Sequence, residues 1–459
     1  MIGEIAYKAI EDNRAKLVEV EKNIWENPEG PYREFKACQW TADVLKDAGF
    51  DVEIGVAGIP TAIKATWGSG HPVIGLLGEY DALPGMSQTH STHKEPIEGQ
   101  AYGQGCGHNL LGVAHLGGAI GLKAEMEAKN LPGTVVFYGC PAEEVLTGKP
   151  FMARGGAFDC LDMCIAFHPG KANQVLCGSA VGINSVKFHF KGRTAHAGGD
   201  PHNGRSALDA VELCNVGAQY LREHVTSDVR IHYIILEGGT APNIVPDKAS
   251  TWYMVRALTR EAVVDVYERL LKVAKGAAMM TETELEIEYL GGCYPTLNNQ
   301  VFAKVLYDVM GNTPKEAFTE EEKAFAHEIN SATPKQYETQ RKAWNLPEGT
   351  ELHEGLLPNV PFNSYGSYDV GDVQYIVPGI MFNTTCNALG SVNHSWQTTA
   401  CVGSSIGEKG MIYASKVMAH FCLKVIEDPS ILAAAQEEFK QVMGDKKYVC
   451  PIPAEVPVP

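Results

Sequence analysis

Three short apolar runs, each followed by a polar turn, constrain the fold of this chain more than any other feature. They are "PVIGLL" at 72–77, "TVVFYG" at 134–139 and "MCIAFH" at 163–168, and segments with helical spacing of apolar residues lie between them. Strands that alternate with helices are typical of a mainly parallel sheet with helices on both faces. Ligands bind such sheets beyond the carboxyl ends of the strands, where this chain places "GEYDAL", "CPAEE" and "HPG".

The pattern changes near residue 183, where apolar and polar residues alternate as in a half-exposed antiparallel strand. The predicted elements then follow the order strand, helix, strand, strand, helix, strand, which is that of a ferredoxin-like unit. We therefore expect an α/β catalytic domain with a mixed, mainly parallel sheet, interrupted by an inserted α+β domain. The expected parts are the first catalytic segment at 1–182, the inserted domain at 183–297 and the second catalytic segment at 298–459.

Other segments carry simpler expectations. Apolar spacing predicts one helix over 5–23 and another over 38–49. Residues 313–360 are rich in Glu, Lys, Pro and Asn with weak periodicity, and we expect a surface excursion there. The proline-rich tail "CPIPAEVPVP" should be extended.

Composition narrows the class of protein. A chain of 459 residues is long enough for two domains, and it has no apolar run of the roughly 18 residues that a membrane helix needs. Its net charge of −17 disfavours nucleic acid and anionic membranes as partners. The 12 cysteines show no framework spacing, which favours reduced thiols. We expect a cytoplasmic protein that binds neither nucleic acid nor membranes.

The stretch "GQGCGHNLLG" places Cys106 and His108 one glycine apart at the start of an apolar helix. Its spacing does not fit a phosphate loop. A cysteine nucleophile would need a base within reach, and neighbours on one loop are no obvious pair. A simple glycine turn with a buried thiol also stays possible for Cys106 alone. A metal site is favoured because further ligand types follow the next two strands.

Those further residues are Glu143 and Glu144 after the second strand and His168 after the third. Thiolate, imidazole and carboxylate together suit zinc, with manganese possible if oxygen and nitrogen donors dominate. Side chains of adjacent residues point in different directions. One glutamate can therefore bind metal while the other serves as a general base. Among the other histidines, only His196 and His394 lie in loops that suggest a role.

The ordered motifs resemble the family-twenty metallopeptidases, in the amidohydrolase branch that contains aminoacylases and hippurate-type hydrolases. The likeness extends from the N-terminal helix to the terminal "CPIP". It rests on seven motifs in order: "GEYDAL", "GCGHNLLG", "GCPAEE", "HPG", "AHAGGDP", "PNIVPD" and "NHSW".

The resemblance implies two divalent metal ions per subunit, zinc or manganese, with ligands Cys106, His108, Glu144, His168 and His394. It implies that Glu143 is the general base. It further implies that His196 stabilises the oxyanion in the partner subunit's site, with Asn243 adding a hydrogen bond. Arg256 would grip a substrate carboxylate, a role that its guanidinium also suits on chemical grounds.

The broader family has a His-x-Asp pair where this chain has Glu79-Tyr80-Asp81, which leaves open which ligand bridges the two ions. We interpret Asp81 as a residue that orients a ligand.

The implied activity is hydrolysis of the amide bond of an N-acyl amino acid, such as p-aminobenzoyl-glutamate or a similar acyl-glutamate or acyl-aspartate, by a homodimer or with a related second subunit. The alternatives are an indoleacetyl-aspartate hydrolase, a dipeptidase for β-alanyl or basic dipeptides, and a catalytically silent regulatory or binding subunit.

Overall fold

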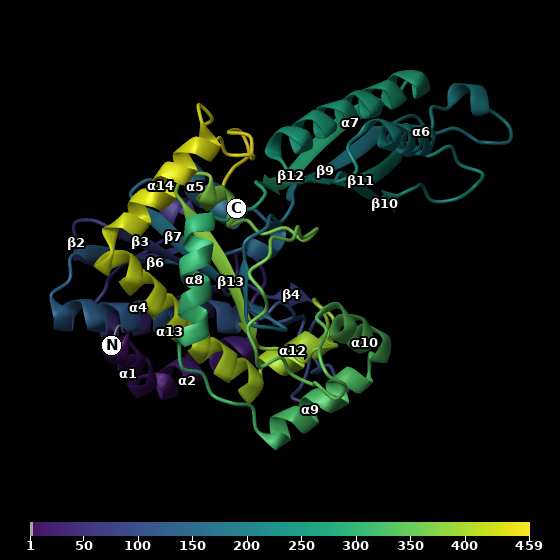
Figure 1. The fold of residues 1–459 in the computed structure, drawn as a ribbon. Coiled ribbons are helices and arrows are strands. Elements are labelled where there is room, and N and C mark those ends of the chain that lie inside the picture. Colours follow the sequence, from purple (N-terminus) through teal and green to yellow (C-terminus); the bar gives the residue numbers. More distant parts are fainter. Residues whose placement is uncertain (1–2) are drawn as a thin grey trace.

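A seven-stranded sheet forms the centre of the larger part of the molecule, and a smaller part projects from it (Figure 1). The computed structural model describes residues 3–459. The four central strands are parallel and the other pairings are antiparallel. In spatial order the strands are β1 (Asp51–Ile54), β2 (Ile63–Ser69), β6 (Gly133–Gly139), β3 (Val73–Gly78), β7 (Met163–Gly170), β13 (Gly379–Thr385) and β8 (Gln174–Leu176).

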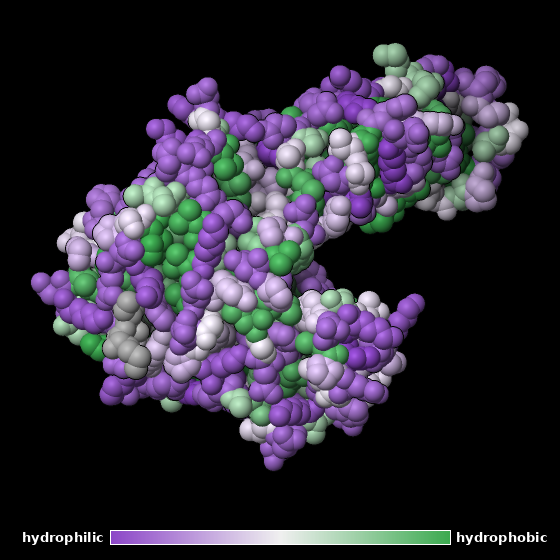
Figure 2. Space-filling view, viewed as in Figure 1, coloured by the Kyte–Doolittle hydropathy of each residue, from purple (hydrophilic) through white to green (hydrophobic). Residues whose placement is uncertain are grey.

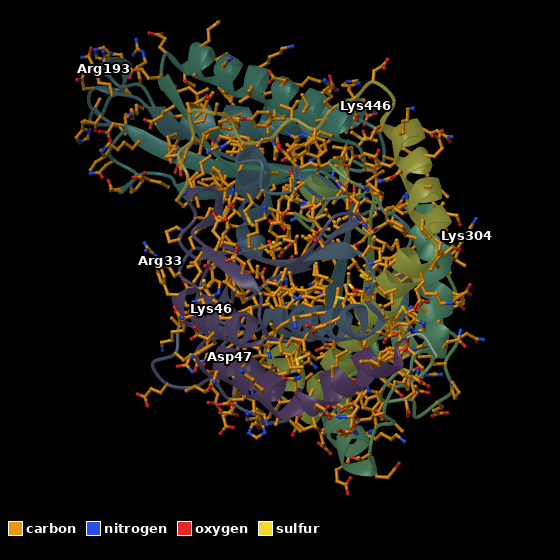
Figure 3. The ribbon with its side chains drawn as sticks, turned by 90° about the vertical axis from the view of Figure 1, so that its left-hand side faces the viewer. Arg33, Lys46, Asp47, Arg193, Lys304 and Lys446 are labelled. Atoms are coloured by element: carbon orange, nitrogen blue, oxygen red, sulfur yellow. The ribbon has the colours of Figure 1, made fainter. Side chains whose placement is uncertain are left out.

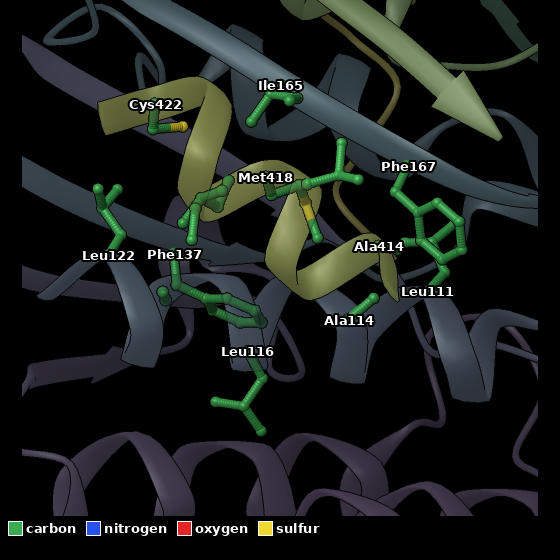
Figure 4. Packing of buried hydrophobic residues seen from close by; sticks show 14 of the residues in the cluster. Leu111, Ala114, Leu116, Leu122, Phe137, Ile165, Phe167, Ala414, Met418 and Cys422 are labelled. Carbon is green, nitrogen blue, oxygen red and sulfur yellow. The ribbon is translucent and has the colours of Figure 1, made fainter. Parts of the chain in front are cut away.

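Alternate residues of the central strands pack on opposite faces of this sheet. On one face, Phe137 and Ile165 join the main hydrophobic cluster, and the side chains of Met418 and Ala414 pack there in Figure 4. On the other face, Val136 joins a second cluster with α5 (Gly148–Arg154), α11 (Gly371–Gln374) and the C-terminal tail. The helices of the first face are α1 (Glu4–Asp12), α2 (Arg14–Glu26), α3 (Phe35–Asp47), α4 (His108–Lys129), α8 (Gln300–Asn312), α13 (Ser405–Glu427) and α14 (Pro429–Met443).

The projecting part has the predicted ferredoxin-like order. An antiparallel sheet in the spatial order β10-β11-β9-β12 carries both helices on one face. Along the chain these elements are β9 (Gly182–Lys191), α6 (Ala207–Leu221), β10 (Arg230–Glu237), β11 (Lys248–Ala257), α7 (Arg260–Thr281) and β12 (Glu284–Cys293). The domain boundaries near residues 183 and 297 stay a prediction.

The structure differs from two expectations. The single helix expected over 5–23 is two helices, α1 and α2, that meet at Asn13. Residues 313–360 contain α9 (Glu320–Ser331) and α10 (Pro334–Ala343), and Ile329 of α9 is buried against α12 (Trp396–Val402). A capping box between Thr319 and Glu322 starts α9, a local signal that the high content of charged residues obscured.

The remaining short elements are a two-stranded sheet of β4 (Leu83–Pro84) and β5 (Tyr102–Gly103), and four 3-10 turns, η1 (Val56–Gly58), η2 (Glu143–Val145), η3 (Pro201–Asn203) and η4 (Arg222–His224). The proline-rich tail contains no helix or strand. Within residues 3–459, no helix combines the length and apolar character that crossing a membrane would require.

Candidate metal centre

A glycine in a left-handed conformation lets Cys106 and His108 face the same point at the start of α4. Gly107 between them has a φ of +85°, which glycine adopts without steric cost. A Cβ at this position would lie only 3.0 Å from the side chain of Val402 and 3.2 Å from that of Pro169. The turn therefore needs glycine, and it brings the thiol and the imidazole to the carboxyl edge of the sheet.

All five predicted metal ligands come together at this edge. Their donor atoms form overlapping groups in which every pair lies within 4.8 Å. The Sγ of Cys106 lies 3.3 Å from Nε2 of His168, and Nε2 of His394 lies 3.8 Å from Oε2 of Glu144. The five predicted ligands make up the groups Cys106–His108–His168 and Cys106–Glu144–His394. A third group, Glu79–His108–Glu143, adds two glutamates that were not predicted as ligands.

His108 is buried and His168 is half-buried, and both are oriented by hydrogen bonds on their outer nitrogens. Nδ1 of His108 lies 2.9 Å from Oδ1 of Asp81, and Nδ1 of His168 lies 2.9 Å from the carbonyl oxygen of Pro169. When Nδ1 carries the proton, Nε2 presents its lone pair to the centre, which is how histidine binds metal. Asp81 therefore lies where it can orient His108, and its role as a residue that orients a metal ligand stays a prediction.

Buried polar atoms without partners mark the middle of the cluster. Among the described residues, Nε2 of His108, Oε1 of Glu143 and Oε1 of Glu144 are buried and accept or donate no hydrogen bond. Burial raises the pKa of Glu144 to about 7 and raises the pKa of Cys106. Burial lowers the pKa of His168 to about 4, which keeps its imidazole neutral. A divalent cation would satisfy these donors and favour their anionic forms, so the residues fit a metal site.

Both adjacent glutamates approach His108, and Glu144 also approaches His394. Oε2 of Glu143 lies 3.7 Å and Oε1 of Glu144 lies 4.0 Å from Nε2 of His108, while Oε2 of Glu144 lies 3.8 Å from Nε2 of His394. Ala142 just before them has a φ of +58°, and its N–H donates to Oε1 of Glu34 at 2.9 Å. Such strain at a non-glycine residue persists where surrounding contacts fix it, often at functional sites. Burial, followed by the negative charge of Glu79, raises the pKa of Glu143 well above its usual range.

A buried network next to the cluster was missed at the sequence level. Lys149 donates to carboxylate oxygens of both Glu79 and Asp369, at 2.5 Å each, and its side chain is wholly buried. The second oxygen of Glu79 lies 3.4 Å from Nε2 of His108. Lys149 stands in "LTGKP" at 146–150, shortly after Glu143 and Glu144. The one sign of this network in the sequence was a lysine that stands between apolar segments.

His196 and Asn243 lie in loops of the projecting part. The contacts of His196 are local: its Nδ1 accepts from the N–H of Gly199 at 2.9 Å, and it pairs with Ile244 in an isolated bridge. Arg193, in the same loop, lies at the far end of the projecting part (Figure 3). The structure does not bring His196 or Asn243 into the ligand groups of their own chain.

Arg256 lies at the end of β11 and contacts the larger part. Its Nη1 donates to the carbonyl oxygen of Tyr365 and to Oγ of Ser367, at 3.3 Å each. The next residue, Tyr368, has its ring centroid 5.3 Å from that of His168. Arg256 is thus connected to the metal cluster through two contacts and the peptide bond between Ser367 and Tyr368.

Comparison with known proteins identifies the family. A family model described as a peptidase dimerisation domain matches residues 179–279. The chain is 37% identical, over 98% of its length, to one of the two subunits of the p-aminobenzoyl-glutamate hydrolase of Escherichia coli (strain K12), and the match covers 97% of that relative. The chain belongs to the M20 family of metallopeptidases. It is accordingly a hydrolase of amide bonds, as the sequence predicted.

One further relative in sequence and two solved structures are also similar to this chain over most of its length. An Xaa-Arg dipeptidase of Mus musculus is 29% identical over 97% of this chain and 93% of its own. An aminobenzoyl-glutamate utilization protein from Klebsiella pneumoniae has a similar structure, with a TM-score of 0.63 and 18% identity over 91% of this chain and 97% of that one. A dinuclear metal-binding M20 peptidase from Bacillus subtilis gives a TM-score of 0.60 and 17% identity over 91% and 99%. These structures confirm the predicted fold class.

Proposed function

We propose that this M20 enzyme hydrolyses the amide bond of an N-acyl amino acid whose carboxyl-side residue is acidic. The substrate is p-aminobenzoyl-glutamate or a similar acyl-glutamate or acyl-aspartate. The observation that carries this proposal is the position of Arg256, which donates to Ser367 next to Tyr368, the residue packed on His168. A guanidinium connected to the metal cluster through Ser367 and Tyr368 suits a substrate with a free carboxylate close to the scissile bond.

The proposed cofactor is a pair of divalent ions, zinc or manganese, held by Cys106, His108, Glu144, His168 and His394. When bound, the ions supply Lewis-acid polarisation of the amide carbonyl and lower the pKa of water. The unpartnered Nε2 of His108 and the thiol of Cys106 support this ligand assignment. Glu79 also lies among the donor groups, with one oxygen held by Lys149.

Glu143 is the proposed general base. It takes a proton from the attacking water and delivers it to the leaving amine. Its burial in the cluster, with Oε2 3.7 Å from Nε2 of His108, supports a position facing the reacting atoms. Its neighbour Glu144 is placed by a hydrogen bond from its backbone N–H to Asp81, at 2.9 Å.

His196 and Asn243 are proposed to act in the site of a partner subunit, where His196 stabilises the oxyanion and Asn243 adds a hydrogen bond. A homodimer provides this arrangement. The Escherichia coli hydrolase is named as two related subunits, both similar to this chain, which supports a related second subunit as an alternative partner. The 12 cysteines are all free thiols, which supports the proposed cytoplasmic location.

A panel assay tests the proposal. The purified protein, treated with chelator and then reloaded with zinc or manganese, is offered p-aminobenzoyl-glutamate, p-aminobenzoyl-aspartate, indoleacetyl-aspartate and β-alanyl-lysine. Cleavage of the acyl-glutamate in the reloaded sample and not in the chelated one is the expected result. Preference for β-alanyl-lysine would favour the dipeptidase alternative, and metal binding without cleavage of any substrate would favour a silent subunit.

A further inference from the structure

The helix-free face of the four-stranded sheet carries a group of basic residues. Arg230 on β10 lies directly opposite Arg256 on β11, and His232 lies opposite Met254. The alternate residues of these strands, such as Ile231, pack against α6 and α7 instead. The helix α7 covers the far side of the sheet, so the basic face is on the side of the larger part (Figure 1). Figure 2 shows a deep notch between the two parts on this side.

Both arginines are held by the same residue of the larger part. The guanidinium carbon of Arg230 lies 4.5 Å from the ring centroid of Tyr365, and Arg256 donates to the carbonyl oxygen of Tyr365. Tyr365 belongs to the segment that continues to Tyr368, which packs on the metal-cluster residue His168. Both guanidinium groups therefore contact the segment that packs on the metal cluster.

Neither arginine forms an ion pair within the described residues, although a hydrogen bond with Thr226 and, to a smaller extent, the charge of Arg230 lower the pKa of Asp228. Within residues 3–459, no carboxylate oxygen lies within 4.0 Å of Arg230 or Arg256, although the net charge of the sequence is −17. The nearby carboxylate of Asp228 accepts from the N–H of Leu258 at 3.1 Å. The Nε of Arg256 is buried and has no hydrogen-bond partner. Burial, followed by the charge of Arg256, lowers the pKa of His232.

There is also space for a ligand beside Arg230. A hollow of about 600 Å³ is lined by β10 and the loop before it, including Arg230 and His232. Arg256 does not line this hollow, and Nη1 of Arg230 donates to the carbonyl oxygens of Ser227 and Val229, at 2.7 and 2.9 Å. A guanidinium group without a carboxylate partner beside such a space suits an anionic ligand with planar oxygen pairs, as in carboxylates.

We propose that Arg230 binds the side-chain carboxylate of the acidic substrate while Arg256 binds its α-carboxylate, so that Arg230 determines the preference for acidic residues. This inference rests on the proposed function. Opposed residues of paired strands have Cβ atoms about 5 Å apart, comparable to the separation of the two carboxyl groups of glutamate. Arg256 is assigned the α-carboxylate because it contacts Ser367, next to Tyr368 and His168, whereas Arg230 contacts only the ring of Tyr365 in this segment.

The test compares two substrates with the same acyl group, p-aminobenzoyl-glutamate and p-aminobenzoyl-glutamine, which differ only in the charge of the side chain. For Arg230→Ala, kcat/KM for the glutamate substrate should fall about 10- to 100-fold, while kcat/KM for the glutamine substrate changes less than about twofold. Arg230→Lys keeps the charge without the bidentate fork and should give an intermediate loss.

Arg269→Ala is the matched control. It removes the same charge from α7, where Arg269 donates to the carbonyl oxygen of His224, and should leave the ratio between the substrates unchanged. Because the side chain of Arg230 is exposed, the variant should fold, and thermal melting checks this.

Three outcomes would overturn the role of Arg230: equal losses for both substrates, no loss for either, or a wild-type enzyme without preference for glutamate. With either of the first two outcomes the wild type still prefers glutamate, so the proposed function stands. A wild type without that preference would leave the amide hydrolysis standing but would overturn the proposed preference for an acidic residue. Failure of the wild type to cleave either substrate would instead overturn the proposed function.

Discussion

Asp81 orients two predicted metal ligands with one carboxylate. Its Oδ1 lies 2.9 Å from Nδ1 of His108, and its Oδ2 accepts from the backbone N–H of Glu144 at 2.9 Å. His108 begins α4 and Glu144 follows β6, so the buried carboxylate joins two segments that are distant in sequence. The geometry of the metal site depends on this residue although it is not itself in a ligand group.

Asp81→Asn should therefore weaken metal binding without removing a ligand. A neutral amide holds the proton of His108 less strongly, and the loss of such an outer partner costs about 10- to 100-fold in metal affinity. Competition with a chromogenic chelator measures the change for zinc. Asp159→Asn, an exposed change, serves as the control, and affinities equal to the wild type in both variants would contradict the orienting role.

Glu143→Ala should abolish turnover while two metal ions stay bound. A general base is worth about 10²- to 10⁴-fold in rate, and its loss removes no ligand if Glu144 fills that role. Kinetics and elemental metal analysis on the same preparation measure both quantities. Loss of an ion together with activity would show that Glu143 is a ligand and that the roles of the two glutamates are exchanged.

Arg256→Ala should discriminate between substrates with and without a free α-carboxylate. A charge-assisted bidentate pair contributes about 1.5–3 kcal/mol, so kcat/KM for an acyl-glutamate should fall about 10- to 100-fold. The α-amide of the same substrate should lose far less. If both substrates lose equally, the effect comes from the contacts of Arg256 with Tyr365 and Ser367, and the carboxylate role is wrong.

The raised pKa of Glu21, which is not a predicted metal ligand, should make the stability of the fold depend on pH. Burial raises its pKa to about 8, and Oε1 accepts from Nδ2 of Asn109 at 2.6 Å. A glutamate in the unfolded chain has a pKa of about 4.3. Between about pH 4.3 and about pH 8, therefore, Glu21 of the native state holds a proton that the unfolded chain has lost. Stability contributed by this proton is present below about pH 4.3 and declines as the pH rises toward about 8.

The variant Glu21→Gln removes this titration. Its free energy of unfolding, relative to the wild type, should increase between about pH 5 and about pH 8, measured by urea denaturation with chelator present. Glu19→Gln, an exposed change on the same helix, should show no such trend. A constant difference between Glu21→Gln and the wild type across this range would mean that Glu21 ionises normally in the folded protein.

The spacing of apolar residues and the order of the expected strands and helices predicted the architecture. They could do so because strands and helices bury apolar residues at regular intervals. The same reasoning placed Cys106, His108 and His168 at one sheet edge. It could not find the contacts of Lys149 with Glu79 and Asp369, since these residues are 70 and 220 positions away and no local pattern marks a buried ion pair. The contact of Arg230 with Tyr365 was hidden for the same reason.

The position of His196 leads to a prediction about subunit exchange. Its contacts lie within its own loop and with Ile244, and Arg193 of that loop lies at the far end of the projecting part (Figure 3). In a two-fold dimer each projecting part can reach the neighbour's metal centre, so each subunit completes the other's site. His196→Ala and Glu143→Ala should then each be inactive alone.

Mixing the two inactive variants should restore activity. In a mixed dimer, the site in the His196→Ala chain has an intact Glu143 and receives an intact His196 from its neighbour, while the other site lacks both. Random exchange of equal amounts makes about half of the dimers mixed, so about a quarter of wild-type activity per total sites should return. Mass spectrometry of differently tagged chains verifies the exchange. Continued inactivity after verified exchange would show that His196 acts within its own chain or takes no part in catalysis.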